Sequence, residues 1–192
     1  DVGAGSPAWS TAPTNTPPGF TVKGGGALTA LAGLLYGLRG DASNAFAVYD
    51  PDTGTNGTWT VKATTPAIVN NGGALTNDGT YLYALGGNST SSFWRYDVSS
   101  DMWDDAAVDD LPGGNVVSDG GALVFDGTHI YALQGNSANF WRYDIATDTW
   151  LPRTDFCDTD GDGAGTGLTV GDGGALTFDG TYIYARGRKG GE

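Results

Sequence analysis

The sequence predicts an all-β protein assembled from one repeated unit of four short antiparallel strands. The stretch from Gly72 to Trp103 returns from Gly120 to Trp150 with its motifs in the same order. The 192 residues include 33 glycines and eight prolines, which suits many short strands joined by tight turns. No apolar pattern of helical period continues beyond a turn or two, so we expect almost no helix.

The unit that begins at Gly72 shows how its strands are assigned. A first strand over 74–76 ends at Asn77-Asp78-Gly79, a tight-turn signal in which the glycine adopts a positive φ without steric cost. The second strand, 80–85, is largely apolar on both faces, and such a strand is buried on both faces. A third strand is expected over 93–98 and a fourth at Trp103.

Three markers give the same period along the chain. The second glycine of a Gly-Gly-Ala-Leu motif falls at Gly26, Gly73, Gly121 and Gly174, with spacings of 47, 48 and 53 residues. A Tyr-Asp pair recurs at 49, 96 and 143, and a tryptophan follows it at 59, 103 and 150. A four-stranded unit with two apolar faces needs a neighbouring copy on each side, and repeats of this length are typical of β-propeller blades.

We therefore predict a β-propeller fold with three full blades and a partial fourth. The predicted blades cover residues 25–71, 72–119, 120–172 and 173–192. An extended lead-in over 1–24 carries one outer strand near Trp9. In the first blade we expect strands over 34–38, 46–49 and 58–62.

At these motifs the chain resembles the kelch-repeat family of β-propellers. The resemblance rests on Gly86-Gly87 after the aromatic-rich strand and on the segments YDVSSDMW (96–103) and YDIATDTW (143–150). The equivalent pairs Arg39-Gly40 and Gln134-Gly135 depart from Gly-Gly at their first position. The resemblance implies a ring of four-stranded blades.

The last predicted blade contains only its first two strands. We expect the missing third strand to come from a longer chain or from another chain, because an exposed strand edge with an apolar face recruits a further strand. Protein partners, through self-assembly or neighbouring domains, are therefore expected.

The charge of the chain limits its partners. The formal net charge is −13, and Glu192 is the only glutamate among the acidic residues. This balance disfavours nucleic acid and anionic membranes as partners. It fits a soluble extracellular surface, a salt-adapted one or a cation-binding one, and we expect an extracellular or cell-surface location. No apolar stretch approaches the roughly 20 residues of a membrane helix, so no membrane insertion is expected.

The sharpest local motif is an acidic loop. Asp158, Asp160 and Asp162, followed by Gly163, match the start of an EF-hand-like calcium loop, in which alternate carboxylates converge on one hard cation. Position 12 of the motif is Thr169 rather than a bidentate glutamate. The two readings are a calcium site, with calcium as the one expected cofactor, and a solvated acidic loop.

Two Trp-Arg pairs occupy equivalent places in the repeat. Trp94-Arg95 and Trp141-Arg142 can form a sugar-binding or protein-binding surface, or they can pack between blades with arginine stacked on aromatic rings. We favour packing. The only histidine, His129, stands where the other copies have tyrosine, so we interpret it as a substituted core position.

Asn56 and Asn88 begin Asn-x-Ser/Thr sequons in expected loops and are candidate glycosylation sites. The preferred function is non-enzymatic: an extracellular propeller module with a structural or interaction role in a surface or filamentous assembly. One alternative is a carbohydrate-binding module that uses exposed tryptophans. The other, which the resemblance implies, is a propeller enzyme of oxidase or glycosidase type with its active residues outside this chain.

Overall fold

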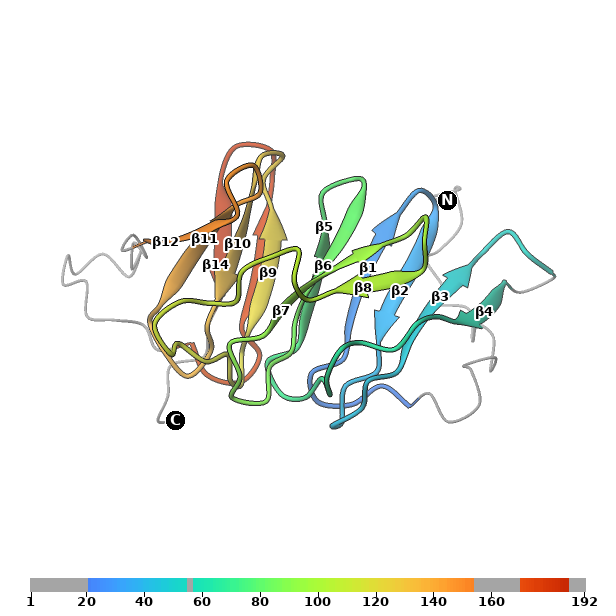
Figure 1. Cartoon of the computed structure of the whole chain (residues 1–192), viewed down its shortest axis with the longest axis horizontal. Helices are drawn as coiled ribbons and strands as arrows, with labels where there is room; N and C mark the ends of the chain where they lie inside the picture. Colours follow the sequence, from blue (N-terminus) through green and yellow to red (C-terminus); the bar gives the residue numbers. More distant parts are fainter. Residues whose placement is uncertain (1–20, 55–56, 154–169, 187–192) are drawn as a thin grey trace, which may run out of the picture.

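The computed structural model describes residues 21–54, 57–153 and 170–186. Fourteen strands form three four-stranded antiparallel sheets and one two-stranded hairpin, and the described residues contain no helix (Figure 1). The all-β class, the four-stranded unit and the absence of helix in this part of the chain agree with the sequence prediction. No helix that could cross a membrane is therefore present among these residues.

Each sheet contains four strands that are consecutive in the chain. Sheet 1 consists of β1 (Ala27–Leu31), β2 (Leu34–Leu38), β3 (Phe46–Asp50) and β4 (Thr58–Val61). Sheet 2 consists of β5 (Ala74–Asn77), β6 (Tyr81–Leu85), β7 (Phe93–Asp97) and β8 (Met102–Asp104). Sheet 3 consists of β9 (Ala122–Phe125), β10 (His129–Leu133), β11 (Phe140–Asp144) and β12 (Thr149–Arg153). The terminal hairpin consists of β13 (Ala175–Phe178) and β14 (Ile183–Arg186).

The sheets stack face to face in chain order. Their first strands, β1, β5, β9 and β13, are neighbours in space in that order. Figure 1 shows sheet 1 at one end of the row and sheet 3 with the terminal hairpin at the other. This is a blade-like arrangement in which sheet 2 has a neighbour on both faces.

The two faces of sheet 2 lie in two separate hydrophobic cores. Leu82 and Trp94 pack with sheet 1, around Tyr36 and Phe46. On the opposite face, Tyr83 packs with sheet 3 in a second core. The prediction that the second strand of the unit is buried on both faces is confirmed: four of the five residues of β6 are buried.

The turn after the second strand requires glycine at the second position of the Gly-Gly motif. That position is glycine in all three sheets, whereas the first position varies. Gly40, Gly87 and Gly135 have φ of 70°, 63° and 68°, and a Cβ on any of them would overlap the backbone of the turn before the first strand. The preceding position is freer, since it holds Arg39 and Gln134 in the other two sheets. The departures from Gly-Gly therefore fall where the fold tolerates a side chain.

The aspartate of the Asp-Gly turn holds together the hairpin between the first two strands. Asp78 accepts hydrogen bonds from the backbone N–H groups of Thr80 and Tyr81 through Oδ1, and from the Tyr83 hydroxyl through Oδ2. The same three bonds recur in the terminal hairpin, where Asp179 is the acceptor. The local structure of the two hairpins is thus the same.

Candidate functional site

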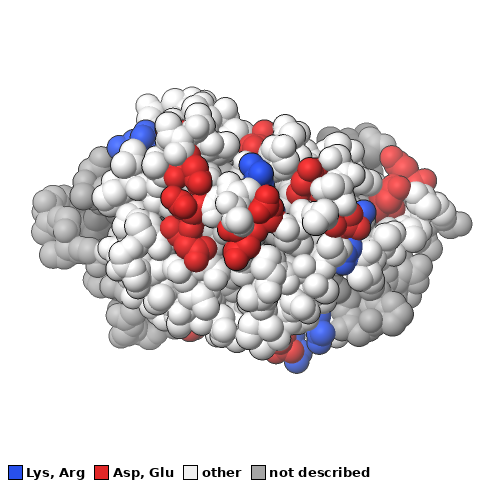
Figure 2. Space-filling view, in the orientation of Figure 1, with Lys and Arg blue, Asp and Glu red and all other residues white. Residues whose placement is uncertain are grey.

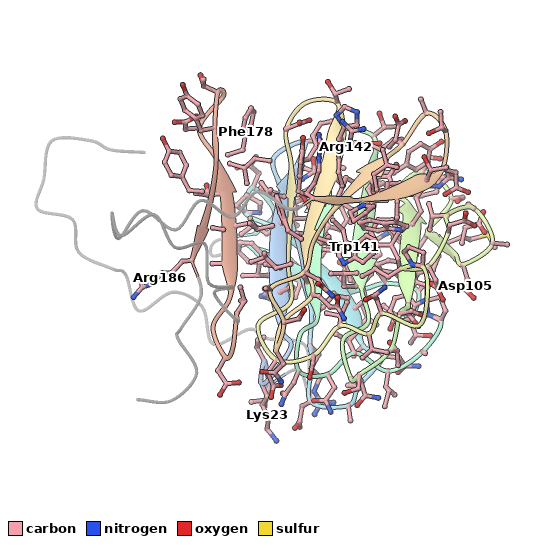
Figure 3. The ribbon with its side chains drawn as sticks, turned by 90° about the vertical axis from the view of Figure 1, so that its left-hand side faces the viewer. Lys23, Asp105, Trp141, Arg142, Phe178 and Arg186 are labelled. Carbon is pink, nitrogen blue, oxygen red and sulfur yellow. The ribbon has the colours of Figure 1, made fainter. Side chains whose placement is uncertain are left out.

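The two tryptophans predicted to lie in a contact surface or between sheets are in the interior. Trp94 is 2% exposed and Trp141 8% exposed. The Trp141 indole N–H donates to Gln134 Oε1 at 3.4 Å, and the side chain lies inside the molecule in Figure 3. These two rings therefore pack the core and offer no face to a ligand.

The neighbouring arginines lie further out. The Arg95 guanidinium is 4.6 Å from the centre of the Tyr81 ring and 3.9 Å from a carboxylate oxygen of Asp104. Arginine therefore stacks on an aromatic ring, but Tyr81 and Arg95 lie on paired strands of sheet 2, so this contact is within one sheet. Arg142 is half-buried, and its Nε atom is buried without a hydrogen-bond partner among the described residues.

A cavity of about 390 Å³, which we call the rim cavity, opens beside Arg95 on sheet 2. It is lined by Tyr81, Arg95, Asp97, Ser100, Met102, Trp103 and Asp104. Aromatic rings beside a cation and carboxylates can hold a small molecule that has both an apolar face and polar groups.

A second cavity, of about 320 Å³, lies where the turns before the first strands meet, lined by Gly24, Gly25, Asn71, Gly72, Asp119, Gly120, Asp172 and Gly173. The carbonyl of Asn71 accepts a bond from the Asn88 N–H at 2.9 Å. Because the peptide is planar and trans, the Gly72 N–H points the opposite way. Two of the residues that line the cavity, Asp119 and Asp172, are acidic.

His129 lies between two carboxylates. Its ring nitrogens are 3.8 Å from an oxygen of Asp126 and 3.8 Å from an oxygen of Asp144. Burial alone would raise the pKa of Asp126, but hydrogen bonds, first from the backbone N–H of His129, hold this pKa below its ordinary value. In the part of the chain that the structure describes, no three histidine, cysteine or acidic side chains are placed to hold a metal ion.

A polar contact between sheets, which sequence reasoning missed, joins sheet 2 to sheet 1 and sheet 3 to sheet 2. Asp101 accepts hydrogen bonds from the Tyr96 hydroxyl at 2.6 Å and from the Ala63 N–H, which follows sheet 1, at 3.0 Å. The Trp103 indole donates to the Ala63 carbonyl at 3.0 Å.

Sheet 3 repeats this arrangement. There, Asp148 takes the role of Asp101, and Trp150 donates to the Asp109 carbonyl at 2.8 Å. The signal for this contact was the spacing Tyr-x4-Asp-x-Trp in sheets 2 and 3. The Tyr-x4-Asp-x-Trp pattern therefore links each of these two sheets to the sheet before it.

The second strand of the terminal hairpin, β14, differs from the second strands of the three sheets in its pairing. Among the described strands, β14 pairs only with β13, whereas β6 lies between β5 and β7. Figure 3 shows the hairpin at one end of the molecule, with Phe178 toward sheet 3 and Arg186 projecting away. Among the described residues, the outer edge of β14 therefore has no partner strand.

The remaining predicted sites are placed only in part. Asn88 is exposed, with φ of 56°, and its Oδ1 accepts a bond from Asn70 Nδ2 at 3.4 Å. The sequon at Asn56 and the acidic residues Asp158, Asp160 and Asp162 lie outside the described residues. Figure 2 shows acidic side chains in several groups on the face of Figure 1, with few basic ones among them.

Comparison with solved structures places the chain among folds of the same class. The structure of YjhT matches with a TM-score of 0.68 at 14% identity, over 91% of this chain and 59% of that one. A functionally unknown protein from Desulfotomaculum acetoxidans DSM 771 matches with a TM-score of 0.51 at 11% identity, over 83% of this chain and 47% of that one. The chain thus spans about three fifths of the first structure and half of the second. No family model and no curated protein matches the sequence.

Proposed function

We propose that the chain is part of a kelch-like β-propeller with a non-enzymatic, structural or interaction role in an extracellular or cell-surface assembly. The stacked four-stranded sheets and the repeated Tyr-x4-Asp-x-Trp contacts between them support the propeller. The charge of −13 supports a solvent-facing extracellular surface, with protein as the main partner.

The observation that carries this proposal is the outer edge of β14. Residues 183–186 have β13 on one side and no described strand on the other. The equivalent strand β6 uses that side to pair with β7, in the register Leu85↔Phe93 to Tyr81↔Asp97. An edge of this kind binds an added strand through main-chain hydrogen bonds, and pockets for alternate side chains give specificity.

A blade-completion peptide tests this proposal. A fluorescently labelled peptide with the sequence of residues 93–104, which forms the third and fourth strands of sheet 2, is titrated with the chain and followed by anisotropy. We expect saturable binding and slower amide exchange in β14. The matched control has the same sequence with N-methylated amides at alternate positions, which cannot complete a strand ladder. Equal binding of both peptides, or of neither, would contradict the proposal.

The rim cavity favours one second function, carbohydrate binding. Trp94 and Trp141 are buried, so any sugar would instead contact Tyr81, Arg95 and Trp103. Aromatic rings and charged groups at one opening suit a sugar ring with its hydroxyls. Oligosaccharide titrations that quench tryptophan fluorescence in the native chain but not in Arg95→Ala would support it, and identical curves would reject it.

A further inference from the structure

The rim cavity belongs to a complete sheet in the middle of the stack. All of its lining residues lie on β6, β7 and β8 or in the turn between β7 and β8. Sheet 2 has sheet 1 on one face and sheet 3 on the other, and all four strands of each of these sheets are described. The surroundings of the rim cavity are therefore those of a full repeat unit with a neighbour on both faces.

One carboxylate of the rim cavity, that of Asp104, departs from the repeat. Asp104 on β8 pairs with Arg95 on β7. At the same place in the register, sheet 1 has Thr60 and sheet 3 has Leu151. The fold thus accepts an uncharged side chain at this position, and the carboxylate is available for binding.

The two carboxylates of the rim cavity keep acceptor capacity. Asp97 accepts hydrogen bonds from the N–H and the hydroxyl of Ser99 through Oδ1, at 2.8 Å and 2.7 Å. Asp104 accepts the Ala106 N–H through Oδ1 at 3.0 Å, and its Oδ2 is 3.9 Å from the Arg95 guanidinium, beyond hydrogen-bond distance. Because a carboxylate has about four acceptor positions, the second oxygen of each is available to a ligand.

The charges of the rim cavity favour a cation. Arg95 is the one cation among the lining residues, and it faces two carboxylates in a chain of net charge −13. A negative potential of this kind concentrates cationic ligands at an opening and disfavours anionic ones. A ligand with a positive charge therefore suits the rim cavity better than a neutral or an anionic one.

The donors and the size of the rim cavity favour a small polar ring over a bare amine chain. The Arg95 guanidinium and the Ser100 hydroxyl are donors that need acceptors, which an alkylammonium chain lacks and sugar hydroxyls supply. The volume of about 390 Å³ lies within the range of about 300–1,000 Å³ that is common for small-molecule sites.

We infer that the rim cavity binds a protonated amino sugar, of which a glucosamine unit is the simplest case. The inference rests on the carbohydrate binding proposed above for this cavity, and it names the class of sugar. Asp97 and Asp104 accept hydrogen bonds from the ammonium group, and Arg95 donates to the hydroxyls. The rings of Tyr81 and Trp103 contact the carbon atoms of the sugar.

Three oligosaccharides of equal length and linkage test the inference. They are built from glucosamine, N-acetylglucosamine and glucose, so they differ only in the group on the second carbon of each ring. Calorimetric titration of the native chain should give an affinity for the glucosamine oligomer at least about fivefold higher than for the other two, because only its amines are charged. Added salt should reduce this preference.

Two matched variants separate the rim cavity from the overall charge of the chain. Asp104→Asn removes a carboxylate of the cavity, and Asp105→Asn removes the same charge from an exposed neighbour that does not line it. Both positions are exposed, so both variants are expected to keep the circular dichroism spectrum of the native chain. We expect Asp104→Asn to lose the preference for glucosamine and to keep its affinity for the glucose oligomer, whereas Asp105→Asn keeps both.

A lysine oligopeptide with the same number of amines is the last probe. Binding of this peptide as tightly as the glucosamine oligomer would overturn the inference and assign the rim cavity to a basic protein partner. Equal losses of the preference in Asp104→Asn and Asp105→Asn would also overturn it, because the attraction would then be to the net charge.

The sugars also distinguish this inference from the function on which it rests. Equal affinity for all three oligosaccharides, lost in Arg95→Ala, would overturn the preference for an amino sugar and leave carbohydrate binding in place. Binding of none of them would reject both.

Discussion

Tyr83 and Tyr184 occupy the same place in two copies of one repeat and make the same bond to their turn, but they differ in burial. Each donates its hydroxyl to the aspartate of its own turn, at 2.9 Å and 2.8 Å. Tyr83 is 1% exposed, whereas Tyr184 is 53% exposed. The repeat therefore encodes the hairpin, and the neighbouring sheet supplies its burial.

The pKa values of the two hydroxyls show the same separation of the local hydrogen bond from burial. The pKa of Tyr83 is raised first by burial and then by the charge of Asp78. The pKa of Tyr184 is raised first by its hydrogen bond to Asp179, and the contribution of burial is the smallest. The local contact is thus shared, while the desolvation comes from the sheet that covers Tyr83.

Truncation of each tyrosine to alanine should separate the local contact in the turn from the burial by the neighbouring sheet. It is the largest effect that we expect. Tyr83→Ala removes a ring from the core between sheets 2 and 3, and we expect it to lower the free energy of unfolding by about 3–5 kcal/mol. Tyr184→Ala should cost much less than Tyr83→Ala, because its ring is exposed and contributes little to the core. Urea denaturation of both variants measures the difference. Equal losses would mean that the hairpin is already covered.

Glycine substitutions test which turns depend on close backbone packing. Gly79→Ala, at φ of 92° and with open space around the added Cβ, should cost about 1–2 kcal/mol through its backbone conformation alone. Gly87→Ala should cost more, because its Cβ would also overlap the Asn71 carbonyl and approach the Gly73 nitrogen. Thermal denaturation in parallel would compare them, and a smaller loss for Gly87→Ala would contradict the packing.

Removal of the charge that joins two sheets should have a smaller effect. Asp101→Asn weakens the bonds from Tyr96 and Ala63, and because the aspartate is partly exposed we expect a loss of about 1 kcal/mol at neutral pH. Asp97→Asn, in the same hairpin but with acceptor bonds only to its own turn, should cost less than Asp101→Asn. Urea midpoints of the two variants provide the measurement.

The stability difference between the native chain and Asp101→Asn should depend on pH. Burial alone would raise the pKa of Asp101, but bonds from Tyr96 and Ala63 and the charge of Lys62 hold it below 3.8, its ordinary value. A carboxylate with a depressed pKa stabilises the fold above its unfolded pKa, and this contribution disappears as the pH falls through the folded value. Below pH 4 the native chain should therefore lose its advantage over Asp101→Asn. A constant difference down to pH 2 would contradict this account.

Most of the strands could be predicted from the sequence, because the same motifs recur at equivalent positions in successive copies of the repeat. The second strand of sheet 1 was placed at its observed bounds, and the third strand of sheet 2 ends at Asp97, one residue before the predicted end. The agreement follows from strong turn signals on both sides of each strand.

The site was harder to predict, because burial depends on partners that are distant in the chain. The letters Trp-Arg in a strand do not tell whether an indole points into a core, and both Trp94 and Trp141 do. The contact made by Asp101 was visible as a spacing, but sheet 1 has Gly57 at the equivalent place two residues before Trp59. With only two copies of the full pattern, its role became clear only from the bonds across the sheets.

Hydrogen–deuterium exchange of β6 and β14 in the monomeric chain tests the central claim most directly. The two strands share their sequence pattern and their turn, but β6 is covered on both faces and paired on both edges. We predict that the amides of β14 exchange at least about tenfold faster than those of β6, since local opening is easiest where few apolar contacts are made. Equal protection of the two strands would show that the repeat alone, rather than the neighbouring sheet, stabilises the hairpin.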